Sequence, residues 1–518
     1  MPRIRDSQDF LSKKEVRETR CLVAVFMLTK TPFLTGFPTL LFGKAKRSAQ
    51  ELLKLQRKQL HENSVSEISA QFSGEITPEL IQRHALTERS RVYSHAVTFW
   101  AFLTQVFSED ASCGKAVARV QQWCRQLKLP APSANTASFV EARQRLPETM
   151  LQGIHHDLLS QFARHGSNTD LWRGHVVKAV DGTSAQMPDT PRNQAKYPQP
   201  SGQAPGCGFP VVQLIGVINL NNGAWEEFVE SDLRVHEHRG FELLYRCVGE
   251  NEILINDRAY TSYELIARLQ EQKSHLIGRH HQSRKLDFRK GKKLGPNERL
   301  QRWTKPGRQS SGSCLSKEKW EQLPEEMEVR IIRVKGPDRT GKPTTKYLVT
   351  TLLDPIQYPV EEIGSLYFHR WEIELRFRDI KTTMGMELLR TKSPEMIRKE
   401  IMMHMIAYNA LRLLMFKAGK KHGRNHRRLS FKGALQALFG SISGFAGVWK
   451  KPVIRKRERD NLLRRIAERV VPERPGRNEP RKLKRRPKPF GWMQQPRHEY
   501  PEHFQTDDHP IKILDAVA

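Results

Sequence analysis

The stretch from Val360 to Met384 constrains the fold of this chain more than any other segment. It contains no proline and a single glycine, and its apolar residues recur at helical spacing, with Ile363, Leu366, Phe377 and Ile380 as the clearest examples. We therefore predict one long amphipathic helix over this stretch.

Four polar residues share one side of this predicted helix: Tyr367, Arg370, Glu374 and Lys381. They stand at offsets of 0, 3, 7 and 14 residues, and at about 100° per residue they fall within roughly 60° of one another around the helix axis. One stripe therefore carries an acid, two cations and a phenol. The simplest interpretation is a solvated charged face, and the spacing alone leaves this interpretation as open as a functional one.

Composition favours a polyanionic partner. The 518 residues carry a formal net charge of +31, and a basic excess concentrated in particular segments is typical of nucleic-acid binding, although a basic protein that merely stays soluble is the alternative. The six cysteines form no Cys-x-x-Cys pair, which argues against a zinc ribbon or a disulfide framework and favours a reducing cytosol.

One apolar segment near the N-terminus could be mistaken for a membrane span. The stretch 21–42 follows basic residues, but Lys30, Pro32, Gly36 and Pro38 interrupt it. Its uninterrupted apolar run is too short to cross a bilayer. We predict a buried helix and loop there, and no membrane partner.

Two aspartates upstream of the long helix follow predicted strands. The run from His175 ends in Asp181-Gly182-Thr183, a hairpin of two strands covers 209–231, and the strand Glu252–Asn256 leads directly into Asp257. Predicted helices over 240–249 and 261–272 and a strand over 275–278 complete the order strand, strand, strand, helix, strand, helix, strand. This order is typical of an α/β ribonuclease-H-like domain, in which the ends of the first and fourth strands are neighbours.

These residues together resemble a known family. Tyr-x2-Arg-x3-Glu-x6-Lys is the signature of the bacterial DDE transposases of the insertion-sequence-four family, and Tyr367, Arg370, Glu374 and Lys381 match it at all four positions. Asp181-Gly182-Thr183 and Asp257-Arg258-Ala259-Tyr260 match the Asp-Gly-Thr and Asp-Arg-x-Tyr motifs of the same family. The resemblance covers roughly residues 90–440.

The resemblance implies roles for these residues. Asp181, Asp257 and Glu374 are expected to be the catalytic, metal-binding carboxylates, with Mg²⁺ as the cofactor and Mn²⁺ as a possible substitute. Two divalent cations about 3.5–4 Å apart stabilise the attacking and leaving oxygens of a phosphodiester, and carboxylates are their usual ligands. The DNA-binding residues are then expected to be Tyr367, Arg370, Lys381 and Arg258.

Other acids compete for the metal-binding role, namely Asp189, Asp232 and Glu372. Glu372 lies about 200° round the predicted helix from Glu374 and so should face away from it. Each of the three proposed carboxylates also has an ordinary alternative, because an aspartate after a strand is usually a turn or cap residue.

The resemblance also implies how the chain is divided. We expect a ribonuclease-H-like catalytic core interrupted by a β-rich insertion, with helical regions at both ends. The expected parts are a helical, DNA-binding N-terminal region over 1–150, core segments over 151–282 and 357–417, an insertion over 283–356, and a helical C-terminal region with a basic tail over 418–518. Two local expectations are a helix start at Thr77-Pro78-Glu79 and a flexible basic tail from Lys450 onward.

The activity that follows is cut-and-paste DNA transposition. Metal-dependent hydrolysis would free the 3′ ends at inverted terminal repeats, and strand transfer would join them to target DNA. The expected partners are double-stranded DNA, both element ends and target, and a second copy of the chain in an active homodimer, in the bacterial cytoplasm at the nucleoid. The alternatives are a ribonuclease-H-like endonuclease or resolvase, and a non-catalytic DNA-binding protein derived from a transposase.

Two tryptophans of the expected insertion, Trp303 and Trp320, are candidates to stack on a nucleotide extruded at the element end. An aromatic face recovers part of the cost of unstacking a base. Packing in a hydrophobic core is the alternative for either residue.

Overall fold

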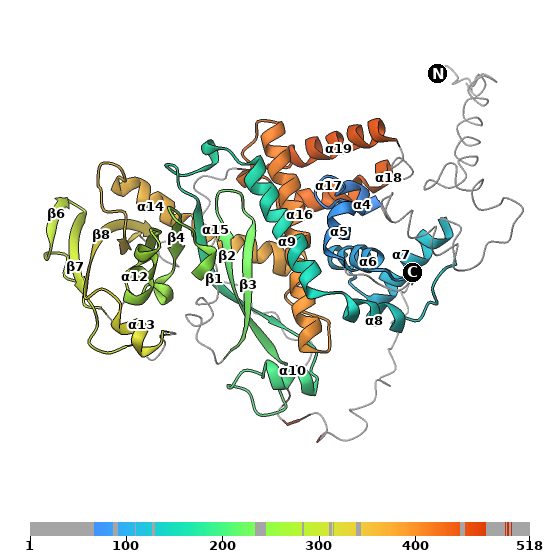
Figure 1. Cartoon of the computed structure of the whole chain (residues 1–518), viewed down its shortest axis with the longest axis horizontal. Coiled ribbons are helices and arrows are strands. Elements are labelled where there is room, and N and C mark those ends of the chain that lie inside the picture. Colours follow the sequence, from blue (N-terminus) through green and yellow to red (C-terminus); the bar gives the residue numbers. More distant parts are fainter. Residues whose placement is uncertain are drawn as a thin grey trace, which may run out of the picture. The chain divides into compact units, whose positions relative to one another are not determined.

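The computed structural model describes most of the chain in two compact units. The described residues are 67–85, 92–108, 110–126, 130–233, 245–281, 284–309, 313, 315–337, 343–445, 451–472, 493, 495, 496 and 499. The first unit comprises 1–104, 112–146 and 437–462, and the second comprises 105–111, 147–436 and 463–518. Figure 1 labels their elements.

The first unit is helical in its described part. Its core contains Phe72, Phe99, Phe102 and Phe139, all fully buried. Segments far apart in sequence meet there, because Gln71 donates hydrogen bonds to the carbonyl of Leu438 and the hydroxyl of Ser441. The helices that lie in it wholly or in part are α4 (Glu67–Gln71), α5 (Pro78–His84), α6 (His95–Phe107), α7 (Cys113–Gln126), α8 (Ala137–Arg145), α17 (Phe431–Gly440), α18 (Ile442–Phe445) and α19 (Pro452–Ala467).

The second unit is built on one nine-stranded sheet in the order β3-β2-β1-β4-β5-β9-β8-β7-β6. Strand β4 runs parallel to β1 and β5, and the other neighbouring pairs are antiparallel. The strands are β1 (Val177–Gln186), β2 (Val211–Asn219), β3 (Trp225–Asp232), β4 (Ile253–Asn256), β5 (His275–Arg279), β6 (Lys292–Gly295), β7 (Glu298–Thr304), β8 (Glu326–Pro337) and β9 (Pro343–Thr350).

Helices cover this sheet. Apolar residues of β1, β2, β4, β7 and β8 form one hydrophobic cluster with α12 (Tyr263–Glu271), while α14 (Val360–Phe368) contacts β5 and β8, and α15 (Trp371–Arg378) contacts β1. The long α16 (Pro394–Lys421) packs along α9 (Glu148–His165) and against β3 (Figure 1). The remaining elements are α10 (Pro191–Lys196), α13 (Lys317–Glu321), the π-helical η4 (Asp379–Thr383), and the 3-10 turns η1 (Asn168–Asp170), η2 (Tyr245–Cys247), η3 (Arg258–Tyr260) and η5 (His426–Arg428).

The mixed α/β class is confirmed, but the predicted end of the first strand is wrong. Strand β1 continues past Asp181 to Gln186, because β2 pairs with it as far as Gln186 and Val211. Asp181 therefore lies within the strand, opposite Gly216.

The predicted continuous helix over 360–384 is also wrong in detail. It breaks between α14 and α15, where the amides of His369 and Arg370 bond to carbonyls only three residues back. It then widens into the π-helical turn η4, in which the amide of Met384 donates to the carbonyl of Asp379. A π turn inserts an extra residue into the helical period and often marks a functional site.

Two local predictions have different outcomes. The helix start is confirmed, since the Thr77 hydroxyl accepts from the amide of Leu80 at 3.2 Å. The flexible tail from Lys450 is wrong at its beginning, because α19 forms there with Leu462 and Ile466 buried at helical spacing. The apolar segment 21–42 and most of the tail beyond 472 lie outside the described residues. None of the helices in the described ranges is both apolar and long enough to cross a bilayer.

A buried ion pair holds the chain where it enters α14. Arg330 of β8 is fully buried and donates to the carboxylate of Glu298 on β7. The same guanidinium donates to the carbonyls of Leu352, Asp354 and Tyr358, at 3.2, 3.3 and 2.8 Å. These carbonyls belong to the segment between β9 and α14, so the pair fixes the sheet to the start of the predicted signature stretch.

We predict that Glu298→Gln destabilises the protein by about 3–5 kcal/mol, because it leaves the guanidinium of Arg330 buried without a counter-ion. Urea unfolding of the full chain, followed by tryptophan fluorescence, measures this loss. The control Glu395→Gln breaks the exposed pair with Arg192, whose side chains are 67% and 64% exposed, and should cost less than about 1 kcal/mol. Equal losses in both variants would contradict the prediction.

Candidate active site

Asp181 lies level with Asp257 on neighbouring strands. The parallel register pairs Ala179 of β1 with Ile255 of β4, and two residues further along each strand come the two aspartates. Adjacent strands lie about 4.8 Å apart. Because Val180 packs in the cluster under α12, strand alternation turns Asp181 toward the opposite face, where α15 packs on β1.

Both aspartates are fixed by the backbone that follows them. The Asp181 carboxylate accepts from the amide of Gly182 at 2.9 Å. Asp257 caps η3 by accepting from the amide of Arg258 at 2.7 Å. A carboxylate held by the next backbone amide loses part of its rotational freedom, so both groups are preorganised on the sheet.

Arg370 joins these acids to the signature helix. Its guanidinium lies 3.3 Å from Asp181 Oδ2 and 3.7 Å from Glu374 Oε1. Burial lowers the pKa of Arg370, but the nearby charges of Asp257, Asp181 and Glu374, together with Tyr367, outweigh burial and raise it. One buried cation therefore contacts Asp181 and Glu374 and interacts electrostatically with Asp257.

The other two signature residues lie beside this cluster. Tyr367 is buried, and burial raises the pKa of its phenol despite the opposing charge of Arg370. Lys381, in the π turn η4, donates to the hydroxyl of Thr183 on β1 at 3.1 Å. Of the four residues of the stripe, Arg370 and Lys381 thus contact β1, Tyr367 is buried, and Glu374 is partly exposed.

The cluster contains carboxylates, which are common ligands of divalent metal ions. In the described part of the chain, no three His, Cys, Asp or Glu side chains are grouped closely enough to bind a metal ion. Two of the three acids, Asp181 and Glu374, contact the guanidinium of Arg370, and Asp257 interacts with it electrostatically. Carboxylate oxygens are the ligands that Mg²⁺ and Mn²⁺ prefer, so the chemistry of the three donors suits such an ion.

Glu372 lies on the other side of α15, where two arginines and a histidine contact it. Its Oε1 accepts a hydrogen bond from Arg427 and lies 2.8 Å from His369 Nδ1, and its Oε2 lies 3.6 Å from Arg376. Burial raises the pKa of Glu372, but the contacts with His369 and Arg427 and the charge of Arg376 outweigh it and lower the pKa from 4.5 to about 2. As predicted, this acid faces away from Glu374.

Several partners of the site were not identified from the sequence. Thr183 had a signal, because it belongs to the Asp-Gly-Thr motif, but nothing in the spacing indicated its bond to Lys381. Arg427 lies 55 residues from Glu372 in sequence, in a segment with no motif. Long-range partners of this kind follow from packing and carry no local sequence signal.

The remaining candidates lie away from the carboxylates or differ in exposure. Trp303 is only 6% exposed and belongs to the hydrophobic cluster under α12, with Arg284 over its ring. Trp320 is partly buried against the same cluster. Arg258 begins η3 next to Asp257 and is half-buried. A stacking role for Trp303 would require it to leave the core, so Trp320 is the more accessible candidate and stays a prediction.

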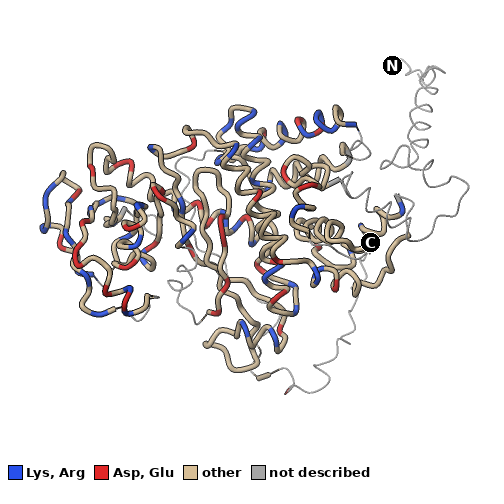
Figure 2. Tube along the Cα trace, viewed as in Figure 1, with Lys and Arg blue, Asp and Glu red and all other residues tan. Residues whose placement is uncertain are grey.

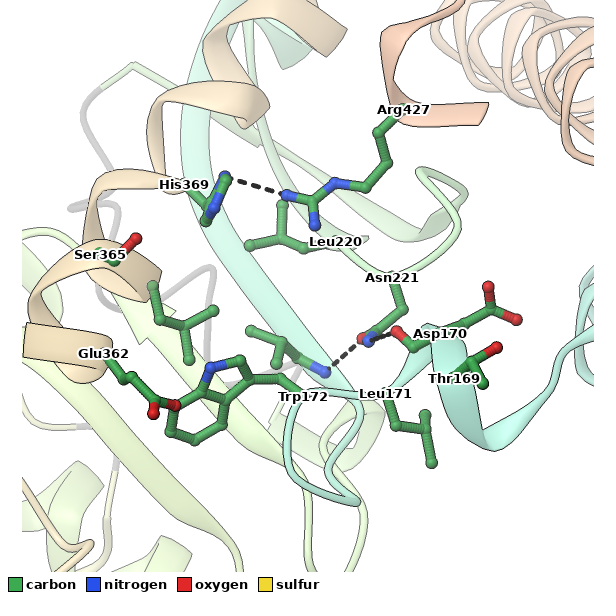
Figure 3. A pocket seen from close by; sticks show the side chains of 12 residues that line it. Thr169, Asp170, Leu171, Trp172, Leu220, Asn221, Glu362, Ser365, His369 and Arg427 are labelled. Carbon is green, nitrogen blue, oxygen red and sulfur yellow. Dashed lines mark hydrogen bonds between the residues drawn. The ribbon is translucent and has the colours of Figure 1, made fainter. Parts of the chain in front are cut away.

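A cavity of about 280 Å³ opens near the beginning of β1 (Figure 3). Trp172, Asn221, His369 and Arg427 are among the residues that line it, and none of the three predicted carboxylates does. Asp181 is four residues further along β1 than the lining residue Val177, about 13 Å along the strand. The cavity is therefore separate from the carboxylate cluster.

The chain is similar to known transposases. A family model described as a transposase DDE domain matches residues 172–410, the segment that contains the cluster. The chain is 26% identical over 357 residues to the transposase InsG for insertion sequence element IS4 of Escherichia coli (strain K12), covering 66% of this chain and 75% of that protein. Among solved structures, a cryo-EM structure of the piggyBac transposase synaptic complex with hairpin DNA matches at a TM-score of 0.40 and 11% identity, over 80% of this chain and 88% of that one.

The low pKa of Glu372 predicts an acid-sensitive contribution to stability. Its folded-state pKa of about 2 lies below its ordinary value of 4.5, so its stabilisation is present above pH 4.5 and is lost as the pH falls toward 2. Glu372→Gln should therefore be less stable than the wild type by up to about 3 kcal/mol at pH 7. The gap should narrow as the pH falls below about 4.5.

Urea unfolding at pH 7, 5 and 4 measures this gap. The matched control is Glu362→Gln on α14, whose exposed pair with Arg173 should contribute little at any pH. A gap for Glu372→Gln that stays constant as the medium is acidified would show that the carboxylate charge contributes nothing.

Proposed function

We propose, from the premise that this chain is a DDE transposase of the insertion-sequence-four family, that it moves its own element by a cut-and-paste route. It would hydrolyse the DNA backbone at the inverted terminal repeats and then join the freed 3′ ends to target DNA. The observation that supports this proposal is the register that sets Asp181 level with Asp257, together with the contacts of Asp181 and Glu374 with the guanidinium of Arg370.

The three carboxylates are proposed to hold divalent cations, Mg²⁺ or in its place Mn²⁺. When bound, such ions would offset the charge that develops on the attacking and leaving oxygens of the phosphodiester. Asp181 and Asp257 would provide a rigid pair of ligands, because a backbone amide holds each one. Glu374, whose side chain is 45% exposed, would complete the site from α15.

The cations of the stripe are proposed to bind DNA phosphates. Arg370 would exchange its carboxylate partners for a phosphate, to which it offers a planar fork of donors, while Lys381 would act as a point charge held near β1 by Thr183. Tyr367 would donate its hydroxyl to a further phosphate, and Arg258 would act beside Asp257. Trp320, more than the buried Trp303, would stack on an extruded base.

The fold supports a ribonuclease-H-like core. Strands β1–β5 run in the order β3-β2-β1-β4-β5 with a hairpin-built edge and parallel crossovers, which is the order expected for such a core. On this basis the core would consist of 151–282 and 357–417, with 283–356 as an insertion. The strands of this insertion extend the sheet, with β9 next to β5. The regions 1–150 and 418–518 would assist in DNA binding and assembly.

The proposed partners are the two element ends, the target DNA and a second copy of the chain. The net charge of +31 supports a polyanionic partner, and Figure 2 shows Lys and Arg gathered along α19 and the β6–β7 hairpin. Two ends must be processed together, so the active form would be a homodimer on DNA. The place of action would be the bacterial cytoplasm at the nucleoid.

Replacing each carboxylate by its amide tests the catalytic proposal. Asp181→Asn, Asp257→Asn and Glu374→Gln should each lower metal-dependent cleavage of end-bearing DNA by a factor on the order of 10³ or more, about 4 kcal/mol of activation free energy. Binding of the same DNA, measured by gel shift, should survive because no cation is lost. Asp189→Asn is the control that should cleave normally. Full cleavage by any of the three amide variants would remove that residue from the site.

DNA affinity should fall steeply with salt, since each neutralised phosphate releases a counterion. Arg370→Ala and Lys381→Ala should each reduce the slope of log K against log salt by about one, while Lys273→Ala should not. Lys273 is an exposed residue just before β5, at the opposite end of that strand from the proposed site. Slopes identical to the wild type in both stripe variants would show that these residues do not contact phosphates.

A further inference from the structure

Helix α15 carries Glu374, but the helix is too short for its own turns to set its rotation about the helix axis. It has only eight residues, it is separated from α14 by the break at His369 and Arg370, and it continues into the π turn η4. In a long regular helix the neighbouring turns would set the direction of each side chain. Here the direction of Glu374 must depend on contacts made by the sides of α15.

A chain of ion pairs lies along the side of α15 opposite Glu374. Arg427 of η5 binds Glu372, Glu372 also contacts Arg376 one turn later, and Arg376 contacts Asp379 in η4 at 3.4 Å. Arg376 and Asp379 are 6% and 7% exposed. The chain therefore ties α15 to a turn beyond α16 at one end and to the π turn at the other.

Figure 3 shows how Arg427 reaches this position. Its side chain extends from η5 toward His369 at the end of α14, and the two groups lie 3.0 Å apart. His369 in turn lies 2.8 Å from Glu372. Glu372 of α15 is thus held by His369, which follows α14, and by Arg427 of η5.

We infer that Glu372 is a positioning residue, which orients α15 so that Glu374 faces Asp181 and Asp257. This inference rests on the proposed metal-binding role of those three carboxylates. A helical side chain ends about 5–6 Å from the axis, so a rotation of α15 by about 30° would move the Glu374 carboxylate by roughly 3 Å. A displacement of that size removes a metal ligand, since functional groups must be held within about 0.5 Å of their productive geometry.

Mn²⁺ binding to the full-length, DNA-free protein tests the inference without relying on cleavage. Free Mn²⁺ is measured by its electron paramagnetic resonance signal, in the wild type, Glu372→Gln, Arg427→Gln, Arg427→Lys and the control Glu362→Gln. Loss of outer partners of metal ligands typically weakens metal binding 10- to 100-fold. We expect Glu372→Gln and Arg427→Gln to weaken Mn²⁺ binding by roughly 10-fold, Arg427→Lys to restore most of it, and Glu362→Gln to leave it unchanged.

A merely structural role predicts a different pattern. It would lower the melting temperature and the amount of folded protein, but the folded fraction would bind Mn²⁺ and end DNA with wild-type affinity. Should Glu372→Gln fail to fold, Arg427→Gln decides, because it removes the partly exposed partner and leaves Glu372 and Arg376 in place. Wild-type Mn²⁺ affinity in folded Arg427→Gln or Glu372→Gln overturns the inference.

The same titration separates this inference from the proposed function. A wild type that binds no Mn²⁺ overturns the proposed metal site itself, and the positioning role with it. If the wild type binds Mn²⁺ and both Glu372→Gln and Arg427→Gln bind it equally well, only the role of Glu372 is overturned.

Discussion

The arrangement of the site depends on the ion pairs that the guanidinium of Arg370 makes with carboxylates. Asp181 comes from the middle of β1, Asp257 from the end of β4 and Glu374 from α15, three segments separated by more than seventy residues each along the chain. Acidic side chains brought near one another repel unless a cation lies among them. The buried cation of Arg370 supplies that compensation from the helix that also carries Glu374. The site can therefore remain assembled before a metal ion or DNA arrives.

Much of this arrangement could be predicted from local pattern. The β-branched runs before Asp181 and Asp257 predicted strands, and parallel strands bring such residues to the same level, as the register of Ala179 with Ile255 confirms. The spacing of the four stripe residues predicted a shared face, and the contacts of Arg370 with Asp181 and of Lys381 with Thr183 agree with it even though the helix is interrupted. Hydrophobic periodicity and secondary-structure propensity are local properties of the sequence, so predictions from them hold even where the predicted end of a helix or strand is slightly wrong.

What could not be predicted depends on partners distant in sequence. Strand β1 extends past Asp181 only because β2 supplies a partner as far as Val211. The break at His369 and the π turn lie beside the ion pairs of Arg376 with Glu372 and Asp379 and of Glu372 with Arg427, and no helical period in the sequence signals them. The burial of Trp303 likewise depends on α12 and the strands β7 and β8 contributing to one hydrophobic cluster.

The pairing of β5 with β9 has a consequence for synthesis of the chain. When the ribosome has released β1 to β5, one edge of that five-stranded sheet ends at β5, and its natural neighbour β9 begins about 60 residues later. At typical translation speeds of about 5–20 residues per second, several seconds pass before the edge is covered. An open strand edge is a template for pairing with other chains. The nascent protein therefore passes through a period in which it is prone to aggregate, and slow emergence of residues 280–350 lengthens that period.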